Sequence, residues 1–171
     1  MEGEVIIKEN TERVKSYLDQ FGYGERVHEF EPGATATVPL AAAAIGCQEA
    51  QIAKSMSFKT PDGDALIIVT AGDGKVNSGK FKHRFGFKAS MLKGDDVLNL
   101  TGHPIGGVCP FALPEDVPVY LDVSMQRFET IYPACGSPAS MVPLTPDELA
   151  ESSRAVEWVD VCKGWQEEEE A

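Results

Sequence analysis

Apolar residues recur at helical spacing near the start of the chain. Between residues 11 and 21, the side chains of Val14, Leu18 and Phe21 are three or four positions apart, and Gly22 follows the last of them. This spacing predicts a helix that ends at the glycine.

A second and shorter helix is predicted over Val38–Ile45. Thr37 is a suitable N-cap, Pro39 falls in the first turn, and Gly46 follows the last helical residue. Its residues are apolar nearly all round, so we expect this helix to be buried.

The middle of the chain changes to strand patterns. Ile52–Lys59 reads I-A-K-S-M-S-F-K, which places Lys54 on the same strand face as the apolar Ile52 and Phe58. Ala65–Ala71 is a continuous apolar run, typical of a central strand. The sequence P-D-G-D between the two runs predicts a turn, so the pair should form a hairpin.

The remaining elements are short and do not alternate regularly. A third helix start is predicted at Thr145, where an N-cap threonine is followed by a proline and, three residues on, by Glu148. Further helices are predicted at residues 78–85 and 94–100, and strands at residues 117–123, 128–132, 140–143 and around Trp158. Because no regular strand–helix alternation is present, the pattern favours an α+β fold with a mixed sheet.

Length and composition indicate one packed domain. The chain has 171 residues, 43% of them hydrophobic and 25% charged, which is ordinary for a globular protein. We expect a single domain over residues 1–165 and a disordered acidic tail over residues 166–171.

Charge is unevenly distributed. The formal net charge is −12, yet residues 75–93 contain no Asp or Glu and six basic residues: Lys75, Lys80, Lys82, Arg84, Lys88 and Lys93. A phosphate backbone responds to the local field, so this basic segment can bind nucleic acid on an acidic protein. A solvated helix face explains it equally well.

Cysteine and histidine spacing gives no metal site. The four cysteines form no C-x-x-C pair and the three histidines are scattered, so we expect no metal and no cofactor. No basic segment followed by an apolar stretch opens the chain, and no apolar run is long enough to span a membrane. Cysteines without a disulfide framework favour the cytoplasm.

Lys54 is the first candidate for chemistry, because it is a charge on an apolar strand face. A lysine there either extends its ammonium group to solvent at the strand end or points into a pocket that uses the charge, and the pattern alone favours the first.

A glycine-rich loop, residues 102–110, is the second candidate. Gly102, Gly106 and Gly107 permit close approach of the backbone, and free N–H groups in such a loop can bind a carbonyl or phosphate oxygen. A tight connection is the plainer explanation. The loop lacks the spacing of a P-loop or a dinucleotide-binding motif, which disfavours nucleotide chemistry.

Two further groups are weaker candidates. Gly136 and Ser137 lie in a turn and offer hydrogen bonds, although turn chemistry explains them too. Cys109 and Cys135 are possible nucleophiles, but no histidine is identifiable as their partner base. His103, beside the glycine loop, is the nearest one.

Together these segments resemble the YbaK/ProX family of trans-editing aminoacyl-tRNA deacylases, which is related to the editing domain of bacterial prolyl-tRNA synthetases. The resemblance covers about residues 35–149. Its markers are the alanine-rich helix, I-A-K-S-M-S-F, A-L-I-I-V-T-A-G-D, the G-G-V-C-P-F loop, and A-C-G-S-P followed by L-T-P-D-E-L.

The resemblance implies a compact, mainly antiparallel mixed sheet, barrel-like and flanked by helices. It implies no metal, no side-chain nucleophile, and hydrolysis by a positioned water or the tRNA's own hydroxyl. The catalytic residues it implies are Lys54, Gly106 and Pro110. Substrate-binding residues would be Ser55, Gly102, His103, Gly107, Gly136 and Ser137, and tRNA would contact Lys75, Lys80, Lys82, Arg84 and Lys88. In many relatives a basic residue occupies the position of Ser137.

The resulting hypothesis is hydrolysis of mischarged aminoacyl-tRNA, with Ala- or Cys-tRNA(Pro) as the expected substrate. Lys54 would bind the terminal phosphate or orient the ester, and the glycine loop would hold the carbonyl oxygen. The expected partner is tRNA, with an aminoacyl-tRNA synthetase as a second candidate and no role for DNA or a membrane. Alternatives are a non-catalytic module that binds aminoacyl-tRNA or a synthetase, and a small-molecule binder of the same fold.

Overall fold

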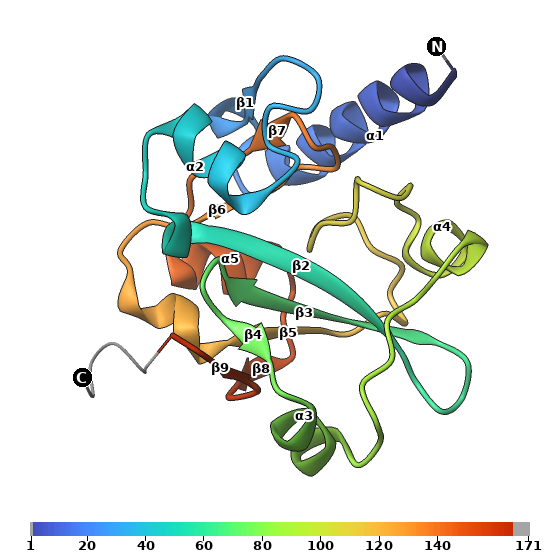
Figure 1. Ribbon diagram of the computed structural model, residues 1–171. Helices are drawn as coiled ribbons and strands as arrows, with labels where there is room; N and C mark the ends of the chain where they lie inside the picture. The colour runs from blue at the N-terminus through green and yellow to red at the C-terminus, as the bar shows by residue number, and fades with distance from the viewer. Residues whose placement is uncertain (1, 166–171) are drawn as a thin grey trace.

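The computed structural model describes the backbone of residues 2–165 and the side chains of residues 7–165. The predicted acidic tail lies outside the described residues. The described part contains five α-helices, three short 3-10 helices and nine strands. Figure 1 shows how the helices and strands are arranged. In chain order they are α1 (Glu2–Asp19), η1 (Gly24–Arg26), β1 (His28–Glu29), α2 (Val38–Ile45), η2 (Glu49–Gln51), β2 (Ile52–Lys59), β3 (Ala65–Ala71), β4 (Lys75–Val76), α3 (Ser78–Phe85), α4 (Asp95–Thr101), β5 (Val119–Asp122), η3 (Val123–Arg127), β6 (Tyr132–Pro133), β7 (Ser140–Met141), α5 (Pro146–Ser152), β8 (Glu157–Val159) and β9 (Cys162–Lys163).

A five-stranded sheet forms the centre of the molecule. Its strand order is β6-β2-β3-β5-β8, and β1-β7 and β4-β9 form two small antiparallel sheets. In the large sheet β2 and β3 are antiparallel, whereas β2-β6, β3-β5 and β5-β8 are parallel. The predicted α+β class with a mixed sheet flanked by helices is confirmed. The large sheet itself has more parallel neighbours than the expectation of a mainly antiparallel sheet allowed.

Both faces of this sheet are covered. Strand β3 is buried along its whole length, as its continuous apolar sequence predicts. Side chains of α1, α4 and α5 pack on one face, together with Ala53 and Ile67. The other face packs Phe58 and Ile68 against Phe81 of α3. Alternate residues of β2 therefore point into different cores.

The N-cap and C-cap of α2 are as predicted, but its burial is not. Thr37 accepts a hydrogen bond from the Leu40 N–H, and Gly46 ends the helix in the left-handed conformation. Only Ala41 and Ala42 are buried, whereas Leu40 is 51% exposed. The expectation of a buried helix was wrong because α2 lies at the edge of the fold and packs through one face only.

Several other elements have the predicted bounds. The β2-β3 hairpin, α3 and the capping box of α5 are confirmed. Helix α1 is longer than predicted and begins at Glu2. The strand predicted at residues 128–132 is confirmed only at its end, where Ile131 forms an isolated bridge with Leu144 and Tyr132 begins β6. Residues 123–127, just before this segment, form η3, because the Asp122 carboxylate accepts a hydrogen bond from the Ser124 N–H and caps the first turn of η3.

No helix within residues 2–165 combines the length and the apolar character needed to cross a membrane.

Candidate functional site

Lys54 is held at the wall of a hollow. Its Nζ donates a hydrogen bond to the Gly74 carbonyl oxygen at 2.8 Å, and the side chain is half-buried. Burial lowers the pKa of Lys54 from its usual value, while the nearby Cys162 and Asp73 oppose that shift. An ammonium group has three N–H donors, so two remain for another oxygen atom.

The hollow has a volume of about 360 Å³ and a mostly apolar lining. Lys54 and Ser55 of β2 line it together with Thr35, Ala36, Thr37, Val38, Ala41, Ile52, Ala53, Tyr132, Ala134 and Met141. Among the described residues, the hydroxyls of Thr35 and Ser55 are buried without a hydrogen-bond partner. Buried polar atoms are nearly always paired, so these two hydroxyls are unusual. The partly exposed ammonium group of Lys54 in a mostly apolar wall marks this hollow as a candidate ligand site.

The residues that hold Gly74 fix the position of the Lys54 ammonium group. Arg127 binds the Asp73 carboxylate through two nitrogen atoms, at 3.0 and 2.5 Å, and donates to the Ser124 carbonyl oxygen at 2.8 Å. A Cβ added to Gly74 would lie 3.3 Å from the Ser124 hydroxyl oxygen, so the loop packs closely on η3. This arrangement presents the Gly74 carbonyl to Lys54.

The glycine loop packs against the turn at Gly136. A Cβ added to Gly107 would lie 2.6 Å from the Gly136 carbonyl oxygen, so only glycine fits there. The Gly107 N–H donates to the Pro104 carbonyl oxygen at 2.8 Å and is thus committed within the loop. Gly102 and Gly106 are exposed and have positive φ angles, of 77° and 85°.

The structure does not bring Lys54 and the glycine loop into one hollow. Ala53 packs in the same core as Cys109 of the loop, while the Lys54 side chain points to the other face, toward Gly74. None of residues 102–110 lines the Lys54 hollow. The connection between them is the segment that runs from Tyr132 and Ala134, in the wall of the hollow, to Gly136 at the loop.

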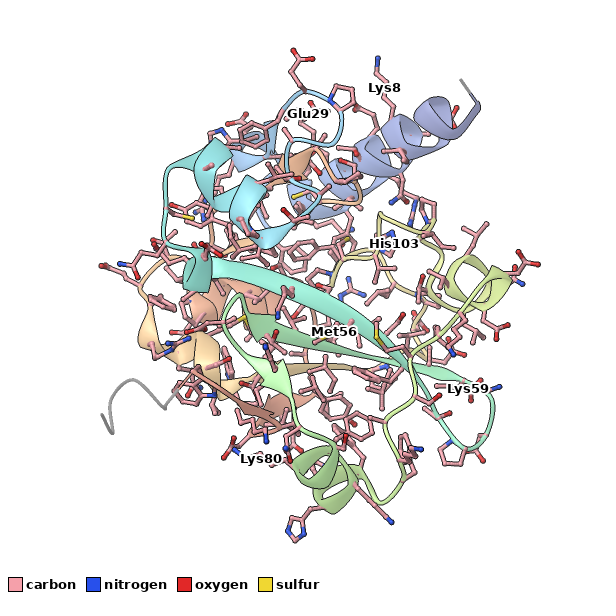
Figure 2. All side chains as sticks on the ribbon, viewed as in Figure 1. Lys8, Glu29, Met56, Lys59, Lys80 and His103 are labelled. Atoms are coloured by element: carbon pink, nitrogen blue, oxygen red, sulfur yellow. The ribbon has the colours of Figure 1, made fainter. Side chains whose placement is uncertain are left out.

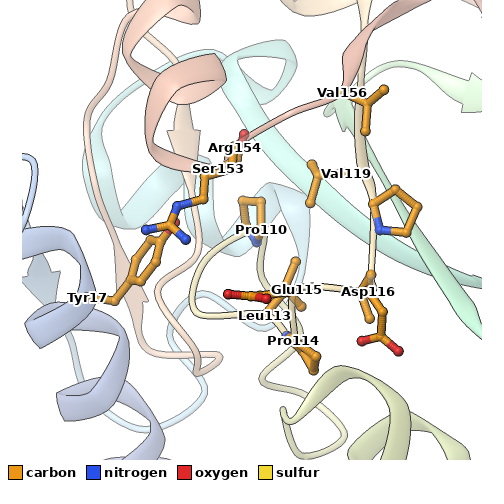
Figure 3. Close-up of a pocket in the computed structure, with 12 residues that line it drawn as sticks. Tyr17, Pro110, Leu113, Pro114, Glu115, Asp116, Val119, Ser153, Arg154 and Val156 are labelled. Carbon is orange, nitrogen blue, oxygen red and sulfur yellow. The ribbon is translucent and has the colours of Figure 1, made fainter.

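Pro110 is buried and lines a second hollow, of about 520 Å³, on another side of the loop (Figure 3). Its other walls come from residues 113–119, Tyr17 and the segment after α5, where Arg154 reaches over the Tyr17 ring. Lys54 and Ser55 are not among its lining residues. The predicted catalytic residues Lys54 and Pro110 therefore line different hollows.

His103 is buried and has a structural environment. Figure 2 places it in the loop that follows α4, close to α1. Its Nε2 lies 2.8 Å from the Phe111 carbonyl oxygen, which only accepts, so Nε2 carries the proton. Nδ1, with its single lone pair, lies 3.0 Å from the amide nitrogen of Asn10 and 3.1 Å from Nη2 of Arg13. Desolvation lowers the pKa of His103 to about 4. With no exposed surface, the ring does not reach a substrate.

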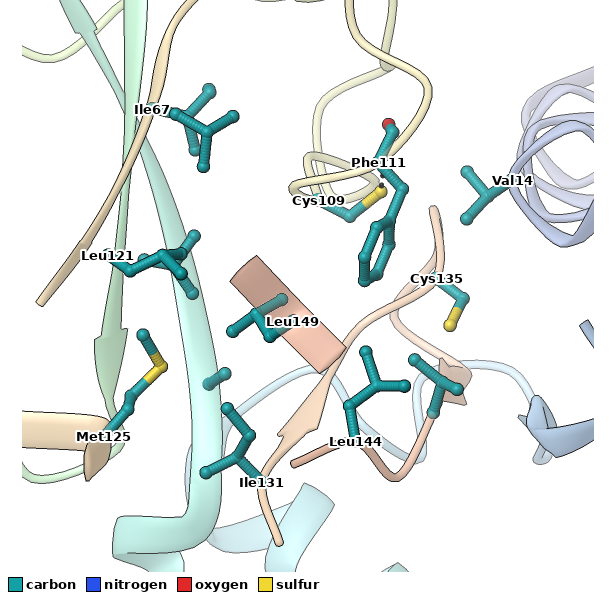
Figure 4. Packing of buried hydrophobic residues seen from close by; sticks show 14 of the residues in the cluster. Val14, Ile67, Cys109, Phe111, Leu121, Met125, Ile131, Cys135, Leu144 and Leu149 are labelled. Carbon is teal, nitrogen blue, oxygen red and sulfur yellow. Dashed lines mark hydrogen bonds between the residues drawn. The ribbon is translucent and has the colours of Figure 1, made fainter. Parts of the chain in front are cut away.

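Cys109 is unsuited to act as a nucleophile. Its Sγ lies 3.6 Å from Nε2 of His103, in the core shown in Figure 4. That nitrogen already carries a proton, and burial raises the pKa of the Cys109 thiol to about 12. Burial also raises the pKa of Cys135. Both cysteines therefore remain protonated thiols that fill the core.

Gly136 and Ser137 are buried in their turn. The Ser137 hydroxyl lies 2.8 Å from the Ser140 hydroxyl and accepts from the Ala139 N–H at 3.2 Å. These hydrogen bonds lie within the turn, so Ser137 has the structural role in the turn that the sequence also allows.

The basic segment starts beside the hollow and continues over α3. Lys75 is exposed, and its charge acts on Lys54. Lys82 and Lys88 are also exposed. Lys80 pairs with Asp160 at 3.1 Å, and Arg84 pairs with Glu157. Two of the predicted tRNA contacts are thus partly occupied by acidic residues of this chain.

Sequence reasoning missed the polar groups that support these features. Asn10 and Arg13 of α1 were not singled out, although both bind the glycine loop and its surroundings. Asn10 lies just before the helix predicted over residues 11–21, and neither residue had a sequence signal, because their partners are distant along the chain. The pairing of Asp73 with Arg127 had no sequence signal, because 54 positions separate the two residues. Within the described residues, no cluster of three or more His, Cys, Asp or Glu side chains offers a metal site.

Comparison with known proteins gives the family context of this geometry. The model of the aminoacyl-tRNA editing domain matches residues 32–152. An uncharacterized protein of Bacillus subtilis (strain 168), YwhH, is 49% identical over 153 residues, which are 90% of this chain and 97% of that protein. A proline–tRNA ligase of Geobacter sp. (strain M21) is 31% identical over 86 residues, which cover 50% of this chain but only 15% of the ligase.

A solved structure shares the fold almost throughout. A candidate trans-editing enzyme for prolyl tRNA synthetase superposes with a TM-score of 0.81 at 31% identity, covering 91% of this chain and 98% of that one.

Proposed function

This chain belongs to the family of aminoacyl-tRNA editing domains, and we propose that it hydrolyses the ester bond of mischarged aminoacyl-tRNA. Similarity to a candidate trans-editing enzyme and to part of a proline–tRNA ligase supports tRNA(Pro) as the tRNA. The observation that carries the proposal is the half-buried ammonium group of Lys54 in the wall of a mostly apolar hollow.

The aminoacyl end of the tRNA binds in this hollow. Alanine side chains make up much of its wall, and Ile52, Tyr132 and Met141 complete the apolar part. Such a lining accepts a small apolar side chain, as in alanine or cysteine. The free N–H donors of Lys54 bind the terminal phosphate or orient the ester.

Thr35 and Ser55 also line the hollow, although their unpaired hydroxyl oxygen atoms are themselves buried. The N-terminus of α2, at Thr37 and Val38, also lines the hollow. Its partial positive charge favours an oxygen atom that becomes more negative in the transition state.

No side-chain nucleophile is required for this reaction. An aminoacyl ester is already activated, so positioning of a water or of the ribose hydroxyl, with hydrogen-bond donors at the carbonyl, supplies the catalysis. The glycine loop acts through its contact with Gly136, which supports the wall of the hollow. Direct binding of the carbonyl oxygen by Gly106 stays a prediction, as does the role of Pro110.

The basic segment provides the tRNA surface. The exposed residues are Lys75 in β4, Lys82 in α3 and Lys88 after α3, and together they are a suitable path for the phosphates of an acceptor stem. A synthetase partner and a cytoplasmic location, both expected from the sequence, stay predictions.

The test is incubation of the purified protein with a panel of mischarged tRNAs, including Ala- and Cys-tRNA(Pro). Release of the amino acid from tRNA(Pro) is the expected result. Binding without release would support a non-catalytic aminoacyl-tRNA module. Absence of both release and salt-sensitive binding would indicate a small-molecule binder of the same fold.

A further inference from the structure

Helix α1 lies outside the residues matched by the family model, yet two of its side chains hold the loops next to the Lys54 hollow. Asn10 and Arg13 are one helical turn apart and therefore on the same face. The Arg13 Nη2 donates to the Asn10 Oδ1 at 2.8 Å. The two side chains form one polar unit that projects from α1.

Arg13 joins the two ends of the glycine-loop region. Its Nη1 donates to the Ala112 carbonyl oxygen at 2.8 Å, and its Nη2 donates to the Gly102 carbonyl oxygen at 3.0 Å. Ala112 has a φ angle of 55°, a left-handed conformation that is unfavourable for a residue other than glycine. The guanidinium group thus holds a strained residue in place while it closes the loop.

Asn10 joins the same loop to the turn at Gly136. Its amide nitrogen donates to the Gly136 carbonyl oxygen at 2.8 Å, and the side chain is 7% exposed. A Cβ added to Gly136 would lie 2.8 Å from this nitrogen, and one added to Gly107 would lie 3.2 Å from it. The helix, the loop and the turn therefore meet at Asn10 with no spare room.

His103 completes the junction inside the loop. Its Nδ1 lone pair faces the Asn10 amide and the Arg13 guanidinium group, while its Nε2 donates to the Phe111 carbonyl oxygen. Every polar group at this junction has a partner, so the network is rigid.

The turn at Gly136 continues the wall of the hollow. Tyr132 and Ala134 line the hollow, and Gly136 follows two residues later. A shift of Gly136 is therefore passed along a short segment to the wall formed by Tyr132 and Ala134.

We propose that Asn10 and Arg13 are positioning residues for the Lys54 hollow: through the glycine loop and Gly136 they fix the wall formed by Tyr132 and Ala134. The catalytic consequence rests on the proposed function, whereas the fixing of the wall does not. Helix α1 is therefore part of the structure that supports the Lys54 hollow.

The test compares Arg13→Ala and Asn10→Ala with Glu12→Ala, a change at an exposed neighbour on α1. Hydrogen–deuterium exchange is measured over residues 102–112 and 132–136 of the full chain. We expect exchange about tenfold faster in both segments for the first two variants, with the β2-β3 hairpin unchanged. The single-turnover rate of Ala-tRNA(Pro) deacylation should fall about tenfold in these two variants. The protein concentration that gives the half-maximal rate should stay within about twofold of the wild-type value.

Arg13→Lys separates geometry from charge. Lysine keeps the positive charge but lacks the planar fork that reaches two carbonyl oxygens. We expect amide exchange in residues 102–112 and 132–136 of Arg13→Lys to be close to that of Arg13→Ala. Full restoration by lysine would contradict the geometric role of Arg13.

Three results would overturn the proposal. The first is unaltered exchange in residues 132–136 of Arg13→Ala and Asn10→Ala. The second is exchange that rises evenly over the whole chain, together with a lower melting temperature. The third is faster local exchange while deacylation stays at the wild-type rate. If the wild-type protein released no amino acid at all, the proposed function would fail, and exchange in residues 132–136 would still decide whether α1 fixes the wall.

Discussion

Burial of His103 makes its protonation unfavourable in the folded protein. Its pKa falls from 6.5 to about 4, so below pH 6.5 the unfolded chain binds a proton that the folded protein does not. The stability contribution of neutral His103 is therefore complete above pH 6.5 and is lost as the pH falls to about 4. The expected loss across this window is about 3 kcal/mol.

Urea unfolding of wild type and His103→Gln at pH 7 and pH 4.5 measures this contribution. The free energy of unfolding should fall with pH more steeply in the wild-type protein. Carboxylates such as Glu148, whose pKa is lowered by Arg26, lose stability in the same direction in both proteins, so the difference isolates the histidine. Parallel pH profiles would contradict a buried neutral His103.

Single residues also show where sequence reading stops. The pattern identified Lys54 as a charge among apolar residues and left its direction open. Its hydrogen bond with the Gly74 carbonyl depends on how β4 and η3 pack, which is a tertiary property. His103 was selected for its place beside the glycines, but burial decides its chemistry, and burial is set by residues far away in the sequence.

At the scale of elements, the capping box of α5 is both predicted and observed. The Thr145 hydroxyl accepts from the Glu148 N–H at 3.1 Å, and the Glu148 carboxylate accepts from the Thr145 N–H at 3.0 Å. Thr145→Ala should lower the free energy of unfolding by about 1 kcal/mol, because it removes the cap. Thr145→Ser keeps a hydroxyl and should remain near the wild type in the same denaturant titration. Equal loss in both variants would assign the effect to the lost methyl group.

Helix α3 and the segment that follows it carry the proposed tRNA contacts Lys82 and Lys88. Lys82→Glu combined with Lys88→Glu should weaken tRNA binding about tenfold or more at low salt and should flatten the dependence of log Kd on log salt. Lys59→Glu, at an exposed lysine outside the basic segment, is the control with a charge change of the same kind. Fluorescence anisotropy with labelled tRNA measures both. Equal weakening by the control would indicate a general charge effect and not a defined surface.

Elements with strong local signals were predictable and those without them were not. The β2-β3 hairpin has a turn sequence between two apolar runs, and α2 has Thr37 and Gly46 at its ends. The strand predicted at residues 128–132 forms only at its end, because pairing with β2 reaches only Tyr132 and Pro133. The parallel neighbours of β2, β3 and β5 also have no local signal, since they join segments distant in sequence.

At the scale of the whole molecule, the candidate site is assembled from distant segments around one edge of the sheet. The Lys54 hollow combines β2, the residues before α2, and the segment at Tyr132. Helix α1 reaches the same region through Asn10 and the turn at Gly136. The order of motifs in the sequence indicated the family, whereas the separation of Lys54 from the glycine loop became visible only in three dimensions.

The central claim is that Lys54 anchors the aminoacyl end of a mischarged tRNA. The most direct measurement is single-turnover hydrolysis of Ala-tRNA(Pro) by wild type, Lys54→Ala and Lys59→Ala, the last being an exposed lysine on the same strand. We predict that Lys54→Ala lowers the rate on the order of 10²–10³-fold, while its melting temperature and the rate of Lys59→Ala stay near the wild-type values. A Lys54→Ala protein that hydrolyses this substrate at the wild-type rate would contradict the account.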